Sequence, residues 1–340
     1  MKFLNFVLAI LFCFVSICFY ACDAAYPKAT SGLLYQKIVG KEECKLIGLG
    51  FGGDIDIVVA PKYDKMPVTE IADGAFKNRR YIESVIIPNS VINIGDQTFF
   101  GCSGLASVIL PENISTIGRE VFHGCSRLTN VVIPNRVTTI DDYAFYGCTS
   151  LTSLSIPNSV TTIGYHAFAG CSGLTSLFIS GDVTTIEFGA LNNCSGLKEI
   201  ILPFVGENKV GTDNTHFGYI FGASLNNYNS SYVPVSLEKV TIFGGAISSR
   251  AFMGCSNLTS VILGDDVESI GVYAFSDCSN LTSVIIGENV KTIDTAAFSG
   301  CSSLTSIKYC GTKKQWQAIE KDLMWDYGAG EYVVTYNYSE

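Results

Sequence analysis

Cysteine is the residue type in this chain whose number and spacing could do the most chemistry. The 340 residues include 13 cysteines, enough for disulfides, metal sites or a reactive thiolate. Eight of them recur with a period of 23 residues, in two runs: Cys102, Cys125, Cys148, Cys171 and Cys194, then Cys255, Cys278 and Cys301. A fixed period places these thiols at one position of a structural repeat, stacked with parallel side chains. We therefore predict a column of buried cysteines that act as small apolar residues, in preference to a disulfide framework.

The other polar groups lack the partners that catalysis or metal binding needs. His123, His166 and His216 have no cysteine or carboxylate set around them at zinc-ligand spacing, and we expect the first two to be solvated turn residues. Asp141-Asp142 lacks the remaining oxygen ligands of a calcium loop. No grouping of serine or cysteine with histidine would bring a nucleophile and a base together. We predict no enzyme, no cofactor and no metal.

One glycine pattern matches a nucleotide-binding fingerprint by letter only. Gly48-x-Gly50-x-x-Gly53 has the dinucleotide spacing, but the apolar run that follows, Ile55 to Val59, is typical of a strand. The fingerprint requires a helix to begin at that point. We therefore discard a dinucleotide site.

The amino-acid composition excludes two further classes of protein, disordered proteins and nucleic-acid-binding proteins. Hydrophobic residues make up 48% of the chain and charged residues 16%, too apolar and too weakly charged for a disordered protein. The net charge is −9, and no dense run of lysine and arginine occurs. Nucleic acid is excluded as a partner because its phosphates attract basic surfaces.

The first residues are typical of an export signal. Lys2 precedes an apolar stretch from Phe3 to Cys22, and small residues follow at Ala24 and Ala25. This pattern predicts a secretory signal over residues 1–24 and a secreted or cell-surface protein. Two alternatives stay open: the run approaches the length of a membrane anchor, and Cys22 could carry a lipid. The membrane is a partner only through this segment.

The elements that must position all other residues form a repeat. One unit reads Leu151-Thr-Ser-Leu-Ser-Ile-Pro-Asn-Ser-Val-Thr-Thr-Ile-Gly-Tyr-His-Ala-Phe-Ala-Gly-Cys171. The alternation at its start predicts a short strand, which the proline ends, and a second extended segment follows. The Ala-Phe pair begins a tight turn, and the glycine lets the chain reverse. One such coil cannot bury its own apolar edge, so neighbouring coils must stack into a solenoid.

These units closely resemble the BspA-like leucine-rich repeats of bacterial and protist surface proteins. The shared pattern is Leu-x-x-Leu-x-Ile-Pro, then Ser-Val-x-x-Ile-Gly, then Ala-Phe-x-Gly-Cys. The resemblance implies a leucine-rich-repeat right-handed superhelix of 23-residue units, mostly β with short turn helices. It assigns residues 25–54 to an N-terminal cap, 55–310 to the solenoid and 311–340, with Trp316, to a C-terminal cap. It also implies a surface protein that binds host or neighbouring-cell proteins.

The repeat is interrupted once, over about residues 204–234. This insertion is rich in aromatic residues, including Tyr219, Phe221 and Tyr232. Long insertions in repeat arrays are often functional, so these three are candidate ligand contacts. The alternative is that the aromatic rings pack the loop back onto the solenoid, because aromatic residues mainly bury area.

A row of outward-facing strand residues is the second candidate contact surface. In each coil the residue between the last two inward positions must project outward. Most members of this row are apolar, and its candidate contacts are Ile109, Val132, Phe178, Ile201, Ile262 and Ile285. The apolar character could reflect β-propensity alone, or it could mark a contact surface. We therefore predict a non-enzymatic, adhesin-like surface protein that binds extracellular proteins or glycans. The alternative is a structural or self-associating component that uses this row.

Overall fold

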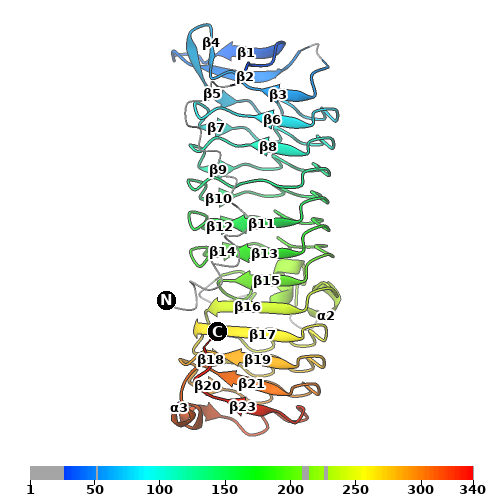
Figure 1. The fold of residues 1–340 in the computed structure, drawn as a ribbon, viewed down its shortest axis with the longest axis vertical. Coiled ribbons are helices and arrows are strands. Elements are labelled where there is room, and N and C mark those ends of the chain that lie inside the picture. The colour runs from blue at the N-terminus through cyan, green and yellow to red at the C-terminus, as the bar shows by residue number, and fades with distance from the viewer. Residues whose placement is uncertain (1–26, 51–52, 209–213, 226–228, 340) are drawn as a thin grey trace.

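The computed structural model describes residues 27–50, 53–208, 214–225 and 229–339. The chain forms a β-solenoid of about 12 coils, with repeats of roughly 23 residues and little helix, which confirms the predicted fold class. The coils stack along one long axis, with the N-terminal strands at the top of Figure 1 and the C-terminal segment at the bottom. The predicted export signal, residues 1–24, lies outside the described residues. Within them, no helix is long and apolar enough to cross a membrane.

A first ladder of parallel strands runs along one side of the column (Figure 1). It begins with a three-stranded sheet of β3 (Asp56–Val58), β6 (Ser84–Ile86) and β8 (Ser107–Ile109). After one coil that has only an isolated bridge between Ser107 and Asn130, an eight-stranded sheet continues the ladder. Its strands are β11 (Ser153–Ile156), β13 (Ser176–Ile179), β15 (Glu199–Leu202), β16 (Lys239–Gly244), β17 (Ser260–Asp266), β19 (Ser283–Ile286), β21 (Ser306–Tyr309) and β23 (Val333–Thr335).

A second ladder is built from strands of two residues, most of them Thr-Ile. One parallel sheet contains β9 (Thr116–Ile117), β10 (Thr139–Ile140), β12 (Thr162–Ile163) and β14 (Thr185–Ile186). Another contains β18 (Ser269–Ile270), β20 (Thr292–Ile293) and β22 (Glu320–Lys321). The isoleucine of each Thr-Ile pair is buried and the threonine is not, so that each strand contributes one residue to the core.

The third side of each coil is a turn that holds a stack of phenylalanine rings in the core. Consecutive rings from Phe76 to Phe168 lie 5.1–5.4 Å apart, each almost parallel to the next. The turns were expected to be short helices, and this detail is wrong. The backbone N–H of Phe145 donates to Ala167 O of the next coil (2.7 Å) instead of closing a helical turn. Tyr143 and Gly147 have positive φ, which also interrupts any helix.

Both ends of the column depart from the repeat. At the N-terminal end, β1 (Leu33–Lys37) pairs antiparallel with β2 (Cys44–Leu49), and β4 (Lys62–Tyr63) pairs antiparallel with β5 (Met66–Ile71). The parallel pairs β2–β5 and β5–β7 (Asn93–Ile94) join these strands to the coils. At the C-terminal end, helix α3 (Lys313–Ala318) begins with a capping box between Thr312 and Gln315 and buries Trp316.

Candidate contact surfaces

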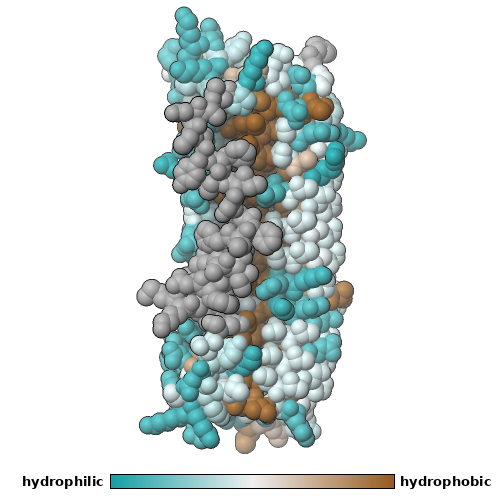
Figure 2. Space-filling view, viewed as in Figure 1, coloured by the Kyte–Doolittle hydropathy of each residue, from teal (hydrophilic) through white to brown (hydrophobic). Residues whose placement is uncertain are grey.

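The outward row forms as the sequence predicts. In the parallel register, Phe178 lies beside Ile201, Ile201 beside Thr241, and Thr241 beside Ile262. The row continues from Ile262 through Ile285 to Lys308. In the shorter sheet, Ile86 lies beside Ile109 in the same way. Figure 2 shows a hydrophobic stripe along the long axis of this face.

The accessibility of the row divides its members into two groups. Ile109 and Val132 are exposed, at 53% and 62% of their surfaces, and Phe178 and Ile262 are partly exposed. Ile201 and Ile285 are buried, with only 8% and 4% of their surfaces exposed. The prediction that they contact a ligand is therefore wrong.

The two buried members each have neighbours on both sides along the ladder. Ile201 lies between Phe178, whose ring packs edge-on against Phe243 at 6.3 Å, and Thr241. Ile285 lies between Ile262 and Lys308. At a strand spacing of about 4.8 Å, long side chains on both sides remove most of the accessible surface. Val132 instead belongs to the coil where the sheet is interrupted.

The aromatic insertion packs mainly inward. Tyr219 and Phe221 lie in the short 3-10 helix η2 (Phe217–Phe221) and are 8% and 0% exposed, so both are corrected from contacts to core residues. Their helix takes the place of a repeat turn: Leu191 N donates to Ile220 O (2.7 Å), and Phe217 N donates to Ala251 O (2.8 Å). The phenylalanine stack continues from Phe217 to Phe252 at 4.7 Å.

The remaining part of the insertion is joined to the next coil by one buried amide. Asn229 begins the short helix α2 (Asn229–Tyr232) and is fully buried. Its Oδ1 accepts from Gly218 N (2.7 Å), and its Nδ2 donates to three carbonyls of the following coil, of which Ala251 O is nearest at 3.1 Å. Tyr232, at the end of the same helix, is 46% exposed and remains a candidate contact. The sequence marks Asn229 only as the start of an Asn-Ser-Ser sequon, a pattern that gives no sign that its amide is buried.

The cysteine column consists of buried thiols of low reactivity. Each of the eight repeat cysteines is a buried thiol without a disulfide, and seven of them lie within hydrogen-bonding distance of a phenylalanine carbonyl of the preceding coil. Cys148 Sγ, for example, donates to Phe122 O at 3.2 Å. Burial raises the pKa of Cys148 well above its usual range and that of Cys102 to about 11. Protonated thiols of this kind are poor nucleophiles and poor metal ligands.

The histidines are ring-stacking residues, and the expectation of solvated side chains is wrong. His123 stacks between Phe100 (4.5 Å) and Tyr146 (4.7 Å), and is half-buried. His166 packs against Tyr143 in the same manner, at 5.6 Å. His216 is buried and one of its ring nitrogens, Nε2, bonds to Ala223 O at 2.9 Å. Burial lowers the pKa of all three, so they are neutral at pH 7. No group of three or more metal-ligating side chains occurs in the described parts of the chain.

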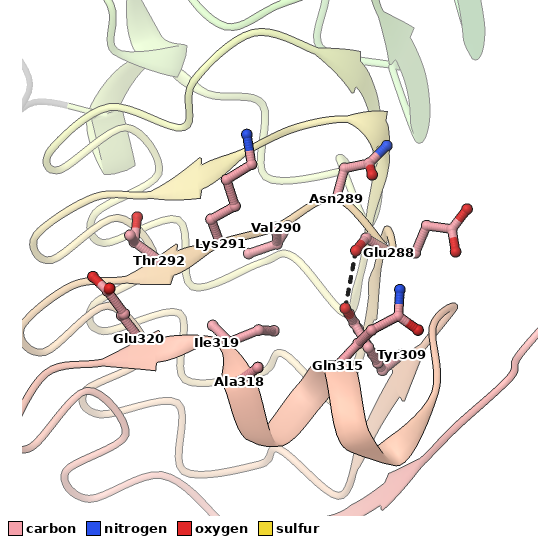
Figure 3. Close-up of a pocket in the computed structure, with 10 residues that line it drawn as sticks. All are labelled: Glu288, Asn289, Val290, Lys291, Thr292, Tyr309, Gln315, Ala318, Ile319 and Glu320. Atoms are coloured by element: carbon pink, nitrogen blue, oxygen red, sulfur yellow. Dashed lines mark hydrogen bonds between the residues drawn. The ribbon is translucent and has the colours of Figure 1, made fainter.

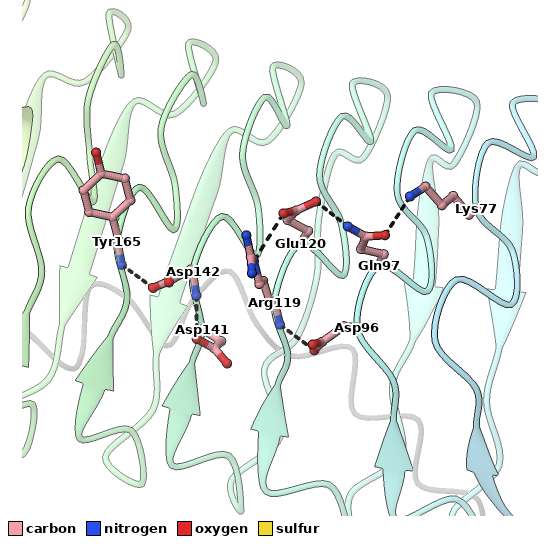
Figure 4. Close-up of polar contacts among 8 residues, drawn as sticks. All are labelled: Lys77, Asp96, Gln97, Arg119, Glu120, Asp141, Asp142 and Tyr165. Atoms are coloured by element: carbon pink, nitrogen blue, oxygen red, sulfur yellow. Dashed lines mark hydrogen bonds and ion pairs between the residues drawn. The ribbon is translucent and has the colours of Figure 1, made fainter.

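The turn side of the solenoid carries a chain of polar contacts across consecutive coils (Figure 4). Lys77 Nζ donates to Gln97 Oε1 (2.6 Å), and Gln97 Nε2 donates to Glu120 Oε2 (2.9 Å). Arg119 pairs with Glu120 at 3.3 Å. Further along, Asp142 Oδ1 accepts from the backbone N–H of Tyr165 at 2.9 Å.

A cavity of about 590 Å³ lies where helix α3 replaces the next repeat segment (Figure 3). Val290, Ala318 and Ile319 contribute apolar surface. Polar residues also line it: Glu288, Asn289, Lys291, Thr292, Tyr309, Gln315 and Glu320. Its two carboxylates lie at opposite ends in Figure 3, and the Tyr309 hydroxyl is bound to Glu288 O at 3.0 Å. This arrangement offers no facing acid and base.

Several solved structures of bacterial leucine-rich repeat proteins are similar to the chain. The leucine-rich repeat protein from Bacteroides ovatus is 22% identical, with a TM-score of 0.42 over 91% of this chain and 100% of that one. A leucine-rich cell surface protein from Faecalibacterium prausnitzii is 22% identical, with a TM-score of 0.44 over 89% of this chain and 100% of that one. The T. pallidum leucine-rich repeat protein is 24% identical, with a TM-score of 0.43 over 75% and 91%.

No curated protein matches the chain significantly. The family model for the BspA type leucine rich repeat region matches in six copies, over residues 69–198 and 227–322. These two segments make up more than half of the chain and contain all eight cysteines of the column. The chain belongs to the BspA-type leucine-rich repeat family.

Proposed function

We propose that this protein is an exported, non-enzymatic cell-surface protein that binds an extracellular protein or glycan in the manner of an adhesin. The observation that carries the proposal is the adjacency of two exposed apolar side chains, Ile109 and Val132, on the outward row. They lie on neighbouring coils at the interruption of the first ladder, and are 53% and 62% exposed. Exposed apolar residues grouped on a rigid repeat surface are typical of a contact site.

The cavity beside α3 has no facing acid–base pair among its described residues, and the repeat cysteines are protonated; both observations support a binding role over a catalytic one. Phe178, Ile262 and Tyr232 are partly exposed and extend the candidate contact area. The export of the protein rests on its first 24 residues alone. Mass spectrometry of the protein recovered from the medium and the membrane fraction would test it: a mature chain that begins after residue 24 supports cleavage, and a lipid mass on Cys22 supports anchoring.

The binding test uses a double variant with a matched control. Ile109→Glu with Val132→Glu places two charges on the exposed part of the row, whereas Ile92→Glu charges an equally exposed isoleucine (56%) that lies outside the row. Both proteins are screened against immobilised extracellular-matrix proteins and a glycan array. We expect the double variant to lose a partner that the wild type and Ile92→Glu retain. Equal binding by all three folded proteins would overturn the placement of the site.

Self-association is the alternative function of the same row. Light scattering of the wild type over a range of concentrations measures it directly. A concentration-dependent oligomer that the double variant lacks and Ile92→Glu keeps would favour the structural role, because only the charged row would then prevent contact between copies.

A further inference from the structure

The turn side of the solenoid carries a second surface, made of aromatic rings from consecutive coils. We call it the aromatic edge, and its members are Phe100, His123, Tyr143, Tyr146, Tyr165, His166, Phe188 and Tyr219. Neighbouring rings are 4.1–6.1 Å apart, and the contacts run unbroken from the first member to the last. Only Tyr219 is buried, and Tyr146 is 39% exposed. This surface is separate from the outward row, which lies on the strand side of the coils.

Carboxylates accompany the rings, and the structure gives them no counter-charge. Asp141, Asp142, Glu187 and Glu207 lie on the same coils as Tyr143, Tyr165, Phe188 and the start of the insertion. None of these four makes an ion pair with a lysine or arginine in the described part of the chain. Burial, and then the charges of Asp142, Glu207 and Asp141, raise the pKa of Glu187, so this carboxyl group lies in the field of three other carboxylates. The histidines of the edge are neutral at pH 7 and add no positive charge.

Two cationic side chains of the protein itself lie over aromatic rings on the turn side. Lys77 occupies the position that corresponds to Phe100 in the preceding coil, and its Nζ lies 4.7 Å from the centre of the Phe100 ring. Arg250 holds the same relation to Tyr273 in a later coil, with its guanidinium carbon 5.8 Å from the ring centre. Between these two places, the rings from His123 to Tyr219 form no cation–π contact in the described part of the chain.

We infer that the aromatic edge binds a cationic segment of a partner protein, with arginine side chains stacked on its rings and paired with its carboxylates. Rings and carboxylates together favour a cation, because the ring faces and the carboxylates both present negative potential. A guanidinium can stack flat on a ring and bond a carboxylate at the same time, so arginine fits better than lysine. The inference rests on the proposed function, since it names the chemistry of one partner of a binding protein.

The test measures binding of fluorescent oligoarginine and oligolysine peptides of equal length by anisotropy. The carboxylate variant, Asp142→Asn with Glu187→Gln, keeps an Oδ1 that can accept from Tyr165 N and removes two charges. The ring variant, Tyr146→Leu with Tyr165→Leu, removes two rings and no charge. The matched control, Asp265→Asn with Glu288→Gln, removes two exposed charges far from the edge. Circular dichroism and the melting temperature verify that each protein is folded.

We expect the wild type to prefer the arginine peptide and to lose affinity for both peptides in about 1 M NaCl, where the Debye length is roughly 3 Å. The carboxylate variant should bind both peptides more weakly than the wild type, and the control should bind them as the wild type does. The ring variant should weaken binding of the arginine peptide by roughly two- to fivefold for each ring, since an exposed cation–π contact is worth about 0.5–1 kcal/mol, and should reduce the preference for arginine.

Three results would overturn the inference. The control could weaken binding as much as the carboxylate variant, which would show attraction to net charge alone. The arginine preference could survive removal of the rings. Binding of a neutral oligosaccharide, lost in the ring variant and unaffected in the carboxylate variant, would identify a glycan surface instead. Ile109→Glu with Val132→Glu should bind the peptides normally, so failure of the proposed contact on the outward row and failure of this inference are separate outcomes.

Discussion

At the scale of single residues, position in the coil decides the effect of a substitution more than residue type does. Phe145 and Tyr146 are adjacent aromatic residues in one turn. The Phe145 ring is fully buried between Phe122 at 5.1 Å and Phe168 at 5.4 Å, whereas Tyr146 is 39% exposed. Phe145→Ala should lower the free energy of unfolding by about 3–5 kcal/mol, because it leaves a cavity in a continuous stack.

Tyr146→Ala is the control for that substitution and should cost far less, because the Tyr146 ring is exposed and contacts the partly exposed rings of His123 and Tyr143. A guanidinium chloride titration of both variants measures the difference. Equal shifts in midpoint would contradict the assignment of the phenylalanine to the core and the tyrosine to the surface.

The cysteine column yields a second prediction at this scale. In Cys148→Ala the Phe122 carbonyl loses the thiol that lies 3.2 Å from it and a small void remains, so we expect a loss of about 1–3 kcal/mol. Cys148→Ser keeps a donor and most of the side-chain volume, so its loss should be smaller than that of Cys148→Ala. In the native protein the repeat thiols should resist a thiol reagent, whereas the partly exposed Cys310 should react. Rapid labelling of all thiols without denaturant would contradict this view.

At the scale of elements, the sequence predicts the register well and the exposure poorly. The period of 23 residues places Phe178 beside Ile201, and the strand pairing confirms it. Whether Ile201 is accessible depends on the size of the side chains on the two neighbouring strands, which no periodicity describes. For the same reason Tyr219 and Phe221 are recognisable as aromatic residues of an insertion, while their place in the core follows from the turn that η2 replaces.

The hydrogen bonds of Asn229 give a testable prediction about the insertion. Its amide accepts from Gly218 N and donates to carbonyls of the following coil, so it joins η2 and α2 to the array. Asn229→Asp cannot donate to those carbonyls and would bury a charge, so it should be at least as harmful as Asn229→Ala. We expect faster amide hydrogen exchange at Ile220 and Phe221 in both variants. Ser230→Ala, at an exposed neighbour, is the control and should leave the exchange unchanged.

At the scale of the whole molecule, the two candidate contact surfaces lie on different sides of the solenoid. The strand side presents the outward row, the turn side presents the aromatic edge, and the stack of phenylalanine rings and buried thiols between them holds the coils at a fixed spacing. Each coil contacts only its neighbours, so a local loss of stability should spread over a limited distance. The arrangement of strand side, core and turn side could be predicted from the sequence, because many repeat units show the same pattern of apolar and polar positions. The aromatic edge could not be predicted, because those rings occupy the variable positions of the repeat.

The C-terminal end provides the test of this one-dimensional behaviour. Trp316 is 8% exposed and contacts Tyr309 at 5.3 Å and Trp325 at 6.3 Å, so α3 covers the last coils with an aromatic cluster. Trp316→Ala should remove about 3–5 kcal/mol from the stability of that end. Because coupling passes only between adjacent coils, amide exchange should quicken most in β19 and β21, less in β16, and not at all in β8. Gln317→Ala, at an exposed position of the same helix, is the control. A uniform increase in exchange along the whole column would show instead that the coils unfold as one cooperative unit.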